Sequence, residues 1–205
     1  MIAIVNYGSG NIQAIGNIYS RLGIQFMVAT TPAELSTAER IILPGVGAFD
    51  QAMNELEKSG LRRALDQAVL VDRKPILGIC VGMQLLARRS EEGQLTGLGW
   101  VPGVVKKFSS SGHQAISLPH MGWNTVEPVR PSPLFDSAEL EIGYYFLHSY
   151  YFSCDQAEDQ LGMTTYGIRY ASAVHRNNIY GVQFHPEKSH QAGIQLLKNF
   201  ATLCL

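Results

Sequence analysis

The sequence predicts an α/β fold in which a mostly parallel central sheet is flanked by helices and extended by antiparallel strands in the C-terminal half. Two observations support this prediction. From Ile2 to Ala87, short apolar segments alternate with segments of helical periodicity, joined by short loops rich in glycine and proline. After Gly97, strand-like segments follow one another with few helices between them.

The N-terminal half consists of repeated strand and helix units. Apolar runs predict strands at 2–6, 24–29, 40–43 and 75–79. The helices between them are predicted to start at Asn11, at Thr31, at Asp50 as the capping residue, at Leu61 and at Val81. Such units give right-handed crossovers, so the carboxyl ends of the strands form the edge where a site is expected.

The C-terminal half is expected to add antiparallel strands and a terminal helix to the same domain. The predicted strands are Trp100–Val101, Val104–Val105, Tyr144–Tyr151, Met163–Tyr170 and Ile179–Phe184, and the predicted helix is His190–Leu205. With 205 residues, 46% of them hydrophobic, the chain can bury one core, so residues 1–205 are expected to form a single domain.

Composition excludes several classes of function. The 16 basic and 17 acidic residues give a net charge of −1 without a basic cluster, which argues against a nucleic-acid partner. Three cysteines without a CxxC pair favour a reducing compartment over a disulfide framework. No signal peptide is recognised at the N-terminus, and the longest apolar run, Pro75 to Ala87, is too short to span a bilayer. A cytoplasmic protein that does not bind a membrane is therefore expected.

The segment Gly78-Ile79-Cys80-Val81-Gly82 has the pattern of a nucleophile elbow, a sharp turn between a strand and a helix. Strand periodicity ends at Ile79, helical periodicity begins at Val81, and the two glycines flank the corner where side chains would clash. The following helix N-terminus would favour the thiolate form of Cys80. Alternatively, Cys80 is a small buried apolar residue, as most free cysteines are.

A second motif near the C-terminus, Phe184-His185-Pro186-Glu187-Lys188, supplies partners for a nucleophile. His185 can act as base and acid near neutral pH, and Glu187, on the same side of an extended chain, can orient its ring. The amides of Gly47 and Val81 could form an oxyanion hole. A solvated ion pair of His185 and Glu187, and a metal site formed with His190, are the alternative interpretations.

The two motifs together resemble those of the class I (triad) glutamine amidotransferases, which hydrolyse glutamine to glutamate and ammonia on a flavodoxin-like fold. Four further segments resemble the glutaminase subunit of imidazole glycerol phosphate synthase in histidine biosynthesis: Tyr7–Asn11, Pro44–Phe49, Pro119–Asn124 and Tyr145–Tyr150. Val46 and Met83 stand where the anthranilate-synthase type usually has proline and histidine.

The resemblance implies roles for individual residues. Cys80 would be the nucleophile, His185 the base and acid, and Glu187 its orienting partner. Four residues would hold the amino-acid end of L-glutamine, namely Gln84, Glu92, Ser149 and Tyr150. Neither a cofactor nor a metal is implied.

The resemblance also implies a heterodimer with a (β/α)₈-barrel synthase/cyclase subunit, which would use the ammonia. The contact residues would be Asn11, Met121, Trp123, Tyr145 and Lys188. Met121 lies between Pro119 and Gly122, and Trp123 follows Gly122. A segment bracketed by proline and glycine suits a docked loop better than a core. The alternatives are the glutaminase of an anthranilate-synthase type complex, a catalytically idle docking subunit, and a cysteine hydrolase of α/β-hydrolase type.

Overall fold

The structure is a computed structural model that describes residues 1–109, 116–137 and 142–203. Its strands are β1 (Ile2–Val5), β2 (Phe26–Ala29), β3 (Arg40–Gly45), β4 (Ile76–Cys80), β5 (Arg89–Ser90), β6 (Gly103–Lys107), β7 (His120–Asn124), β8 (Glu127–Pro128), β9 (Tyr144–His148), β10 (Tyr150–Cys154), β11 (Gln160–Tyr166), β12 (Ile168–Arg176) and β13 (Ile179–Val182). The main sheet has the order β2-β1-β3-β4-β13-β12-β10-β6-β5, and β11 pairs with β12 and β8. β7 and β9 form a separate two-stranded sheet.

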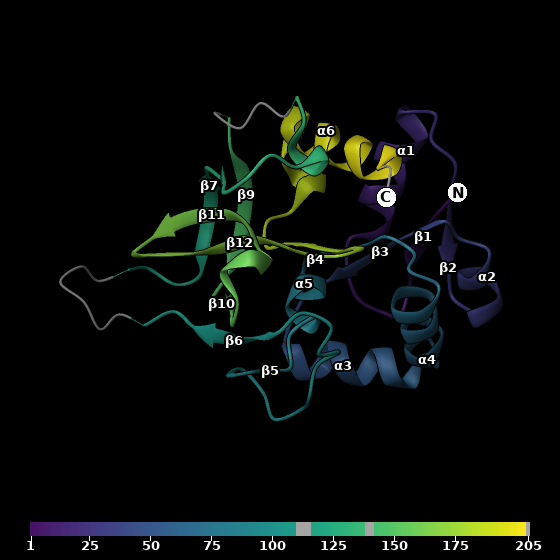
Figure 1. Cartoon of the computed structure of the whole chain (residues 1–205), viewed down its shortest axis with the longest axis horizontal. Coiled ribbons are helices and arrows are strands. Elements are labelled where there is room, and N and C mark those ends of the chain that lie inside the picture. The colour runs from purple at the N-terminus through teal and green to yellow at the C-terminus, as the bar shows by residue number, and fades with distance from the viewer. Residues whose placement is uncertain (110–115, 138–141, 204–205) are drawn as a thin grey trace.

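The predicted fold class is confirmed. The strands β2, β1, β3, β4 and β13 are parallel, whereas β12, β10 and β6 join them as antiparallel strands. In Figure 1 the antiparallel part extends to the left of the parallel part. The carboxyl ends of β3 and β4 are side by side because Gly45 is in register with Cys80.

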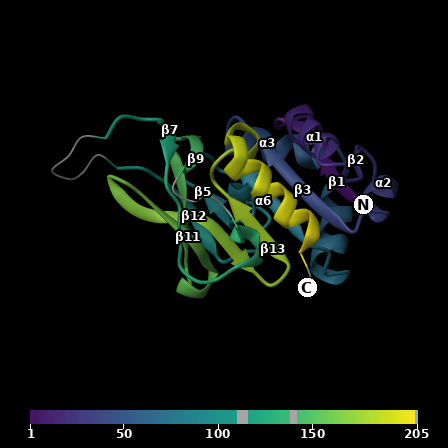
Figure 2. The ribbon, with the colours of Figure 1, turned by 90° about the horizontal axis from the view of Figure 1, so that it is seen from above.

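Helices cover both faces of the parallel sheet. They are α1 (Ile12–Arg21), α2 (Pro32–Ser36), α3 (Phe49–Lys58), α4 (Arg62–Asp66), α5 (Val81–Leu85) and α6 (His190–Thr202), with short helical turns η1 (Gln67–Val71), η2 (Pro133–Phe135), η3 (Ala157–Asp159) and η4 (Pro186–Lys188). Figures 1 and 2 show α1 and α6 on one face and α3, α4 and α5 on the other. The Tyr19 hydroxyl of α1 donates to the Leu197 carbonyl of α6 at 3.2 Å.

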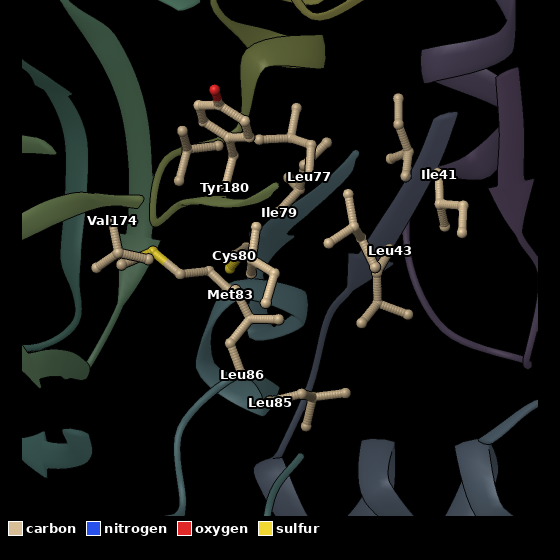
Figure 3. Packing of buried hydrophobic residues seen from close by; sticks show 14 of the residues in the cluster. Ile41, Leu43, Leu77, Ile79, Cys80, Met83, Leu85, Leu86, Val174 and Tyr180 are labelled. Atoms are coloured by element: carbon tan, nitrogen blue, oxygen red, sulfur yellow. The ribbon is translucent and has the colours of Figure 1, made fainter. Parts of the chain in front are cut away.

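The core lies where α5 packs on the sheet. Met83 and Leu85 of α5 and the following Leu86 are fully buried, and Figure 3 shows Met83 reaching toward Val174 of β12. Gly181 of β13 leaves room for this contact, because a Cβ atom there would lie 2.7 Å from Met83 Cγ. Close packing of this kind fixes the elbow against the sheet.

Several predicted boundaries are wrong in the C-terminal half. Tyr144–Tyr151 is two strands, β9 and β10, separated at Ser149, and Met163–Tyr170 spans parts of β11 and β12, which turn at Gly167 with a φ of +68°. Trp100–Val101 is not a strand, because the Trp100 indole N–H donates to Asp66 Oδ1 at 2.9 Å in an irregular segment.

Two further predictions need correction, and two lie partly outside the described residues. The docked loop predicted around Met121 and Trp123 is the strand β7. Asp50 does not cap α3, which begins at Phe49; its carboxylate accepts from the backbone N–H groups of Gln94 and Leu95 instead. The terminal helix ends at Thr202, and residues 204–205, including Cys204, lie outside the described residues. In the described chain, no helix combines the length and apolarity that crossing a membrane requires.

Candidate active site

The elbow at Cys80 has the geometry that its sequence predicts. Cys80 ends β4 with φ +56° and ψ −113°, and α5 starts at the next residue. A positive φ is costly for a residue with a side chain, by about 1 to 3 kcal/mol, and persists only where the surrounding packing enforces it. The packing here therefore holds the sulfur at the carboxyl edge of the sheet.

The glycines around the elbow allow three backbone segments to meet. A Cβ atom at Gly82 would lie 1.9 Å from the Leu43 carbonyl oxygen, and one at Gly78 would lie 2.7 Å from the Gly82 oxygen. A Cβ atom at Gly45 of β3 would lie 2.5 Å from the Gly82 nitrogen. The sequence pattern identified Gly78 and Gly82, and the structure adds Gly45, which brings the Pro44–Gly47 segment against the start of α5.

His185 and Glu187 reach the sulfur from the end of β13. His185 lies within hydrogen-bonding reach of Cys80, and its Nδ1 is 2.8 Å from Glu187 Oε1. Both side chains are buried, at 3% and 1% exposure, so a solvated surface pair is excluded. Their contact depends on the 3₁₀ turn η4, which begins at Pro186, and not on the extended chain that we expected.

The electrostatics of the pair favour a charged resting state. Burial alone lowers the pKa of His185, but its hydrogen bonds to Cys80 and Glu187 and the charges of both outweigh burial and raise the pKa to about 10. Burial raises the pKa of Glu187, but its interactions with His185 and the amide of Asn11 outweigh burial and lower the pKa. At neutral pH an imidazolium therefore lies beside Cys80.

The positive N-terminal end of the helix after Cys80 is weaker than the sequence suggested, because the helix is short. α5 has only five residues, Val81–Leu85. A helix macrodipole grows with the number of aligned peptide units, so one turn and a half supplies little of it.

Three side chains that follow β1, those of Tyr7, Ser9 and Asn11, form hydrogen bonds to the predicted oxyanion segment and to the predicted triad. These bonds were not assigned to them from the sequence. The Tyr7 hydroxyl donates to the Pro44 carbonyl at 2.7 Å. Ser9 Oγ donates to the Val46 carbonyl and accepts from the Val46 N–H, both at 3.0 Å. Asn11 Nδ2 donates to Glu187 Oε1 at 2.7 Å. These contacts join residues that are 37 to 176 positions apart in the chain.

One cavity of about 500 Å³ brings most of the predicted site residues together. It is lined by the nucleophile and base, by both oxyanion residues, by all four substrate-binding residues and by part of the predicted interface, namely Cys80, His185, Gly47, Val81, Gln84, Glu92, Ser149, Tyr150, Asn11 and Lys188. Glu187 does not line the cavity and lies behind His185. The volume suits a ligand of amino-acid size.

Two of the predicted substrate-binding residues are held by neighbouring groups. Gln84 Nε2 donates to the Tyr150 carbonyl at 3.3 Å and to Gln183 Oε1 at 3.1 Å. Glu92 Oε2 accepts from the Phe49 N–H at 2.9 Å and so holds the first turn of α3. Both hydrogens of the Gln84 amide are used by these bonds, which leaves its carbonyl oxygen for a ligand.

The remaining interface residues gather on β7, β9 and η4. Met121 and Trp123 of β7 are 65% and 45% exposed, so both side chains are available to a partner. The Trp123 ring meets Tyr145 edge to face at 6.4 Å, and Lys188 Nζ lies 5.6 Å from the centre of the Tyr145 ring. We call the surface formed by Met121, Trp123, Tyr145 and Lys188 the β7 face.

His190, the third residue of the alternative metal site, points elsewhere. Its ring stacks on Trp123 with the ring centres 5.1 Å apart. Across residues 1–109, 116–137 and 142–203, no three His, Cys, Asp or Glu side chains converge on a metal-sized site.

Comparisons with known proteins agree with this geometry. Residues 3–204 match the family described as glutamine amidotransferase class-I. The imidazole glycerol phosphate synthase subunit HisH of Bdellovibrio bacteriovorus is 54% identical over 99% of this chain and 100% of its own, and that of Leptospira interrogans is 45% identical with the same coverage. The solved structure of PurLQS from Thermotoga maritima has the same fold, with a TM-score of 0.72, 16% identity and coverage of 98% of this chain and 96% of that one.

The chain belongs to the class-I glutamine amidotransferases, because residues 3–204, nearly the whole chain, match that family. Within that class, the chain belongs to the family of the imidazole glycerol phosphate synthase subunit HisH. The predicted function, the glutaminase subunit of that synthase in histidine biosynthesis, is confirmed at the level of the family. The full-length relatives do not favour the anthranilate-synthase type.

Proposed function

We propose that this chain hydrolyses the side-chain amide of L-glutamine at Cys80 and releases the ammonia to a (β/α)₈-barrel synthase/cyclase subunit. The Cys80 thiolate attacks the amide carbon, and the Gly47 and Val81 amides stabilise the oxyanion. The carbon–nitrogen bond then breaks as His185 gives its proton to the leaving nitrogen. Water, deprotonated by His185, attacks the glutamyl thioester, and glutamate leaves as the thiolate re-forms.

The contact between His185, Cys80 and Glu187 is the observation that carries this proposal. Because the pKa of His185 is raised to about 10, the proton that the leaving ammonia needs is already on the imidazole at neutral pH. Glu187 keeps the ring in place through Nδ1, so that Nε2 serves the reaction. The charge of Glu187 also stabilises the imidazolium throughout the cycle.

The amino-acid end of the substrate is held at the opposite wall of the cavity. Glu92 and the carbonyl oxygen of Gln84 accept from the α-ammonium group, because both offer acceptors. The segment Ser149–Tyr150, where β9 has ended and β10 begins, contributes backbone groups beside them. This arrangement selects a free amino acid whose side chain can reach Cys80.

The proposal predicts covalent labelling of Cys80 by a glutamine analogue that carries an electrophile in place of the amide. We expect Cys80 to be labelled at pH 7 and free glutamine to protect it, because both ligands use the same cavity. Mass spectrometry of the Cys80 peptide measures the labelling. A Cys80 that reacts with neither the analogue nor a small alkylating agent would identify an idle docking subunit.

The partner is proposed to bind the β7 face. Four side chains there combine exposed apolar surface with a cation, which is typical of protein interfaces. Asn11 and Lys188 also line the cavity, so a partner on this face would lie next to the site of ammonia release. The printed name of the relatives, a synthase subunit, agrees with such a partner.

Replacing Trp123 by alanine is expected to weaken the partner complex by roughly thirtyfold, since aromatic residues at the centre of an interface often contribute about 2 kcal/mol or more. The dissociation constant can be measured by titrating the labelled barrel subunit. The matched control is Val71→Ala in η1, another exposed apolar residue, at 65% exposure, in a different part of the chain. Equal binding by the two variants would contradict the assignment of the β7 face.

A further inference from the structure

A buried glutamine next to the catalytic histidine contacts the nucleophile. Gln183 follows β13, its side chain is fully buried, and its Nε2 lies 3.9 Å from Cys80 Sγ. This distance is within hydrogen-bonding range for sulfur. The reaction described above gives Gln183 no role.

The surrounding contacts fix which end of the Gln183 amide faces the sulfur. The Tyr150 carbonyl can only accept, so the Gln84 group that faces it at 3.3 Å must be its N–H. The same Gln84 nitrogen faces Gln183 at 3.1 Å, so the atom of Gln183 on that side must be the accepting Oε1. The donating Nε2 of Gln183 is therefore the end that faces Cys80.

The Tyr150 carbonyl at the start of this chain of contacts is itself fixed. It accepts from His148 Nδ1 at 2.7 Å. Burial lowers the pKa of His148 to about 3, so the ring is neutral, and Nε2 is left as an acceptor. It faces His120 Nδ1 of β7 at 3.1 Å and the Tyr170 hydroxyl at 3.1 Å, both of which can donate. A series of hydrogen bonds thus connects β7 with the sulfur, and at the Tyr150 carbonyl it receives donors from both sides, His148 and Gln84.

We propose that Gln183 is a positioning residue for the glutaminase reaction, which holds the Cys80 sulfur as a thiolate by donating a hydrogen bond from an amide whose orientation Gln84 and Tyr150 determine. A donor favours the anionic form of its partner, and hydrogen bonds to charged groups are the stronger ones. This inference rests on the proposed function and assigns one more residue to it.

The test compares Gln183→Met, which keeps the size of the side chain and removes the donor, with the wild type in the assembled complex. We expect kcat with glutamine to fall about tenfold, the KM for glutamine to stay unchanged, and the rate of alkylation of Cys80 by iodoacetamide at pH 7 to fall by a similar factor. Turnover with added ammonium salt should not change. The alkylation rate is read from the Cys80 peptide, so other cysteines do not contribute.

The matched control is Ser172→Ala. Ser172 is equally buried, and its backbone carbonyl pairs with the Gln183 N–H at 2.9 Å, but its hydroxyl bonds Thr164 and not Cys80. This variant should lose stability without slowing alkylation. If thermal unfolding shows that Gln183→Met does not fold, Gln183→Asn replaces it, because the shorter side chain cannot reach the sulfur.

The inference would be overturned by alkylation and kcat at wild-type values in a folded Gln183 variant, or by equal slowing in Ser172→Ala. Failure of the proposed function looks different, because the wild-type complex would then not use glutamine at all. A change in KM alone would place Gln183 in substrate binding and would also reject the positioning role.

Discussion

Replacing Cys80 by alanine is expected to abolish glutamine-dependent activity of the assembled enzyme, by a factor of at least about 10⁴, while ammonia-dependent synthesis by the partner continues. Among the described residues that line the cavity, Cys80 is the one cysteine, and His185 lies within hydrogen-bonding reach of its sulfur. Alanine removes the sulfur without adding bulk to the crowded elbow, so the fold and the β7 face should be preserved. The partner would then receive ammonia from solution instead of from this subunit.

The two activities are measured on the same preparation, with glutamine and then with an ammonium salt as the nitrogen source. The matched control is Cys154→Ala, which changes a free cysteine in β10, where burial raises the pKa of the thiol to about 12 and keeps it unreactive. The control should retain both activities. Loss of the ammonium-dependent activity in Cys80→Ala would indicate that Cys80 supports the structure of the complex instead of the chemistry.

Local patterns were sufficient to predict the elbow and the parallel strands β1 to β4. The prediction for Ile179–Phe184 was wrong, because this segment was expected as an antiparallel addition and its strand β13 pairs parallel with β4. The change from strand to helical periodicity at Cys80 and the glycines beside it lie within five residues of one another, and each has a single steric explanation. The strands β1 to β4 are separated by loops with glycine or proline signals, so their order could be read along the chain. The resemblance to known amidotransferases then connected Cys80 with His185 across the sequence.

Contacts between distant segments could not be predicted in the same way. Ser9 and Val46 meet because β1 and β3 are neighbours in the sheet, and Gln183 and Cys80 meet because β13 and β4 are neighbours, an order that the sequence does not state. Gln183 also lies in a predicted strand that is otherwise apolar, and no sequence pattern assigns a function to a single polar residue there. The only available signal was a polar side chain at a position where the strand is buried on both faces.

The errors in the C-terminal half have a similar cause. The turn between β9 and β10 at Ser149 has no glycine or proline, so the two strands appeared as one. Gly167 did mark the turn between β11 and β12, and its positive φ explains why glycine stands there. Pro119 and Gly122 suggested a loop, but pairing of β7 with β9 overrides these local preferences.

The free subunit is expected to hydrolyse glutamine slowly, and the partner with its ligand bound should raise turnover by on the order of 10² to 10³, which is the effect of one oxyanion donor. In the free chain, Ser9 holds both the N–H and the carbonyl of Val46, and the carbonyl belongs to the same peptide group as the Gly47 N–H. That peptide cannot rotate while Ser9 holds it. Gly47, with a φ of +85°, supplies the backbone freedom that a rotation needs.

Ser9→Ala tests this explanation directly. Removing the hydroxyl breaks two hydrogen bonds of about 1 kcal/mol each, so the population with a rotated peptide should grow by roughly tenfold or more, and the basal rate of the free subunit should rise with it. The ratio of the rate in the loaded complex to the rate of the free subunit should fall by the same factor, because the rate of the complex is already at its maximum and only the rate of the free subunit rises. Glutamate release is measured for the subunit alone and in the loaded complex.

The control for Ser9→Ala is Ser20→Ala, an exposed serine of α1 that should leave both rates unchanged. A variant with unchanged basal activity would show that Ser9 does not restrain the oxyanion segment. A fall in basal activity would show that the arrangement held by Ser9 is already the active one. Activation by the partner would then act at another place. The buried hydrogen bonds between β7 and Cys80 would be the next element to test. High activity of the free wild-type subunit, equal to that of the loaded complex, would remove the need for any such restraint.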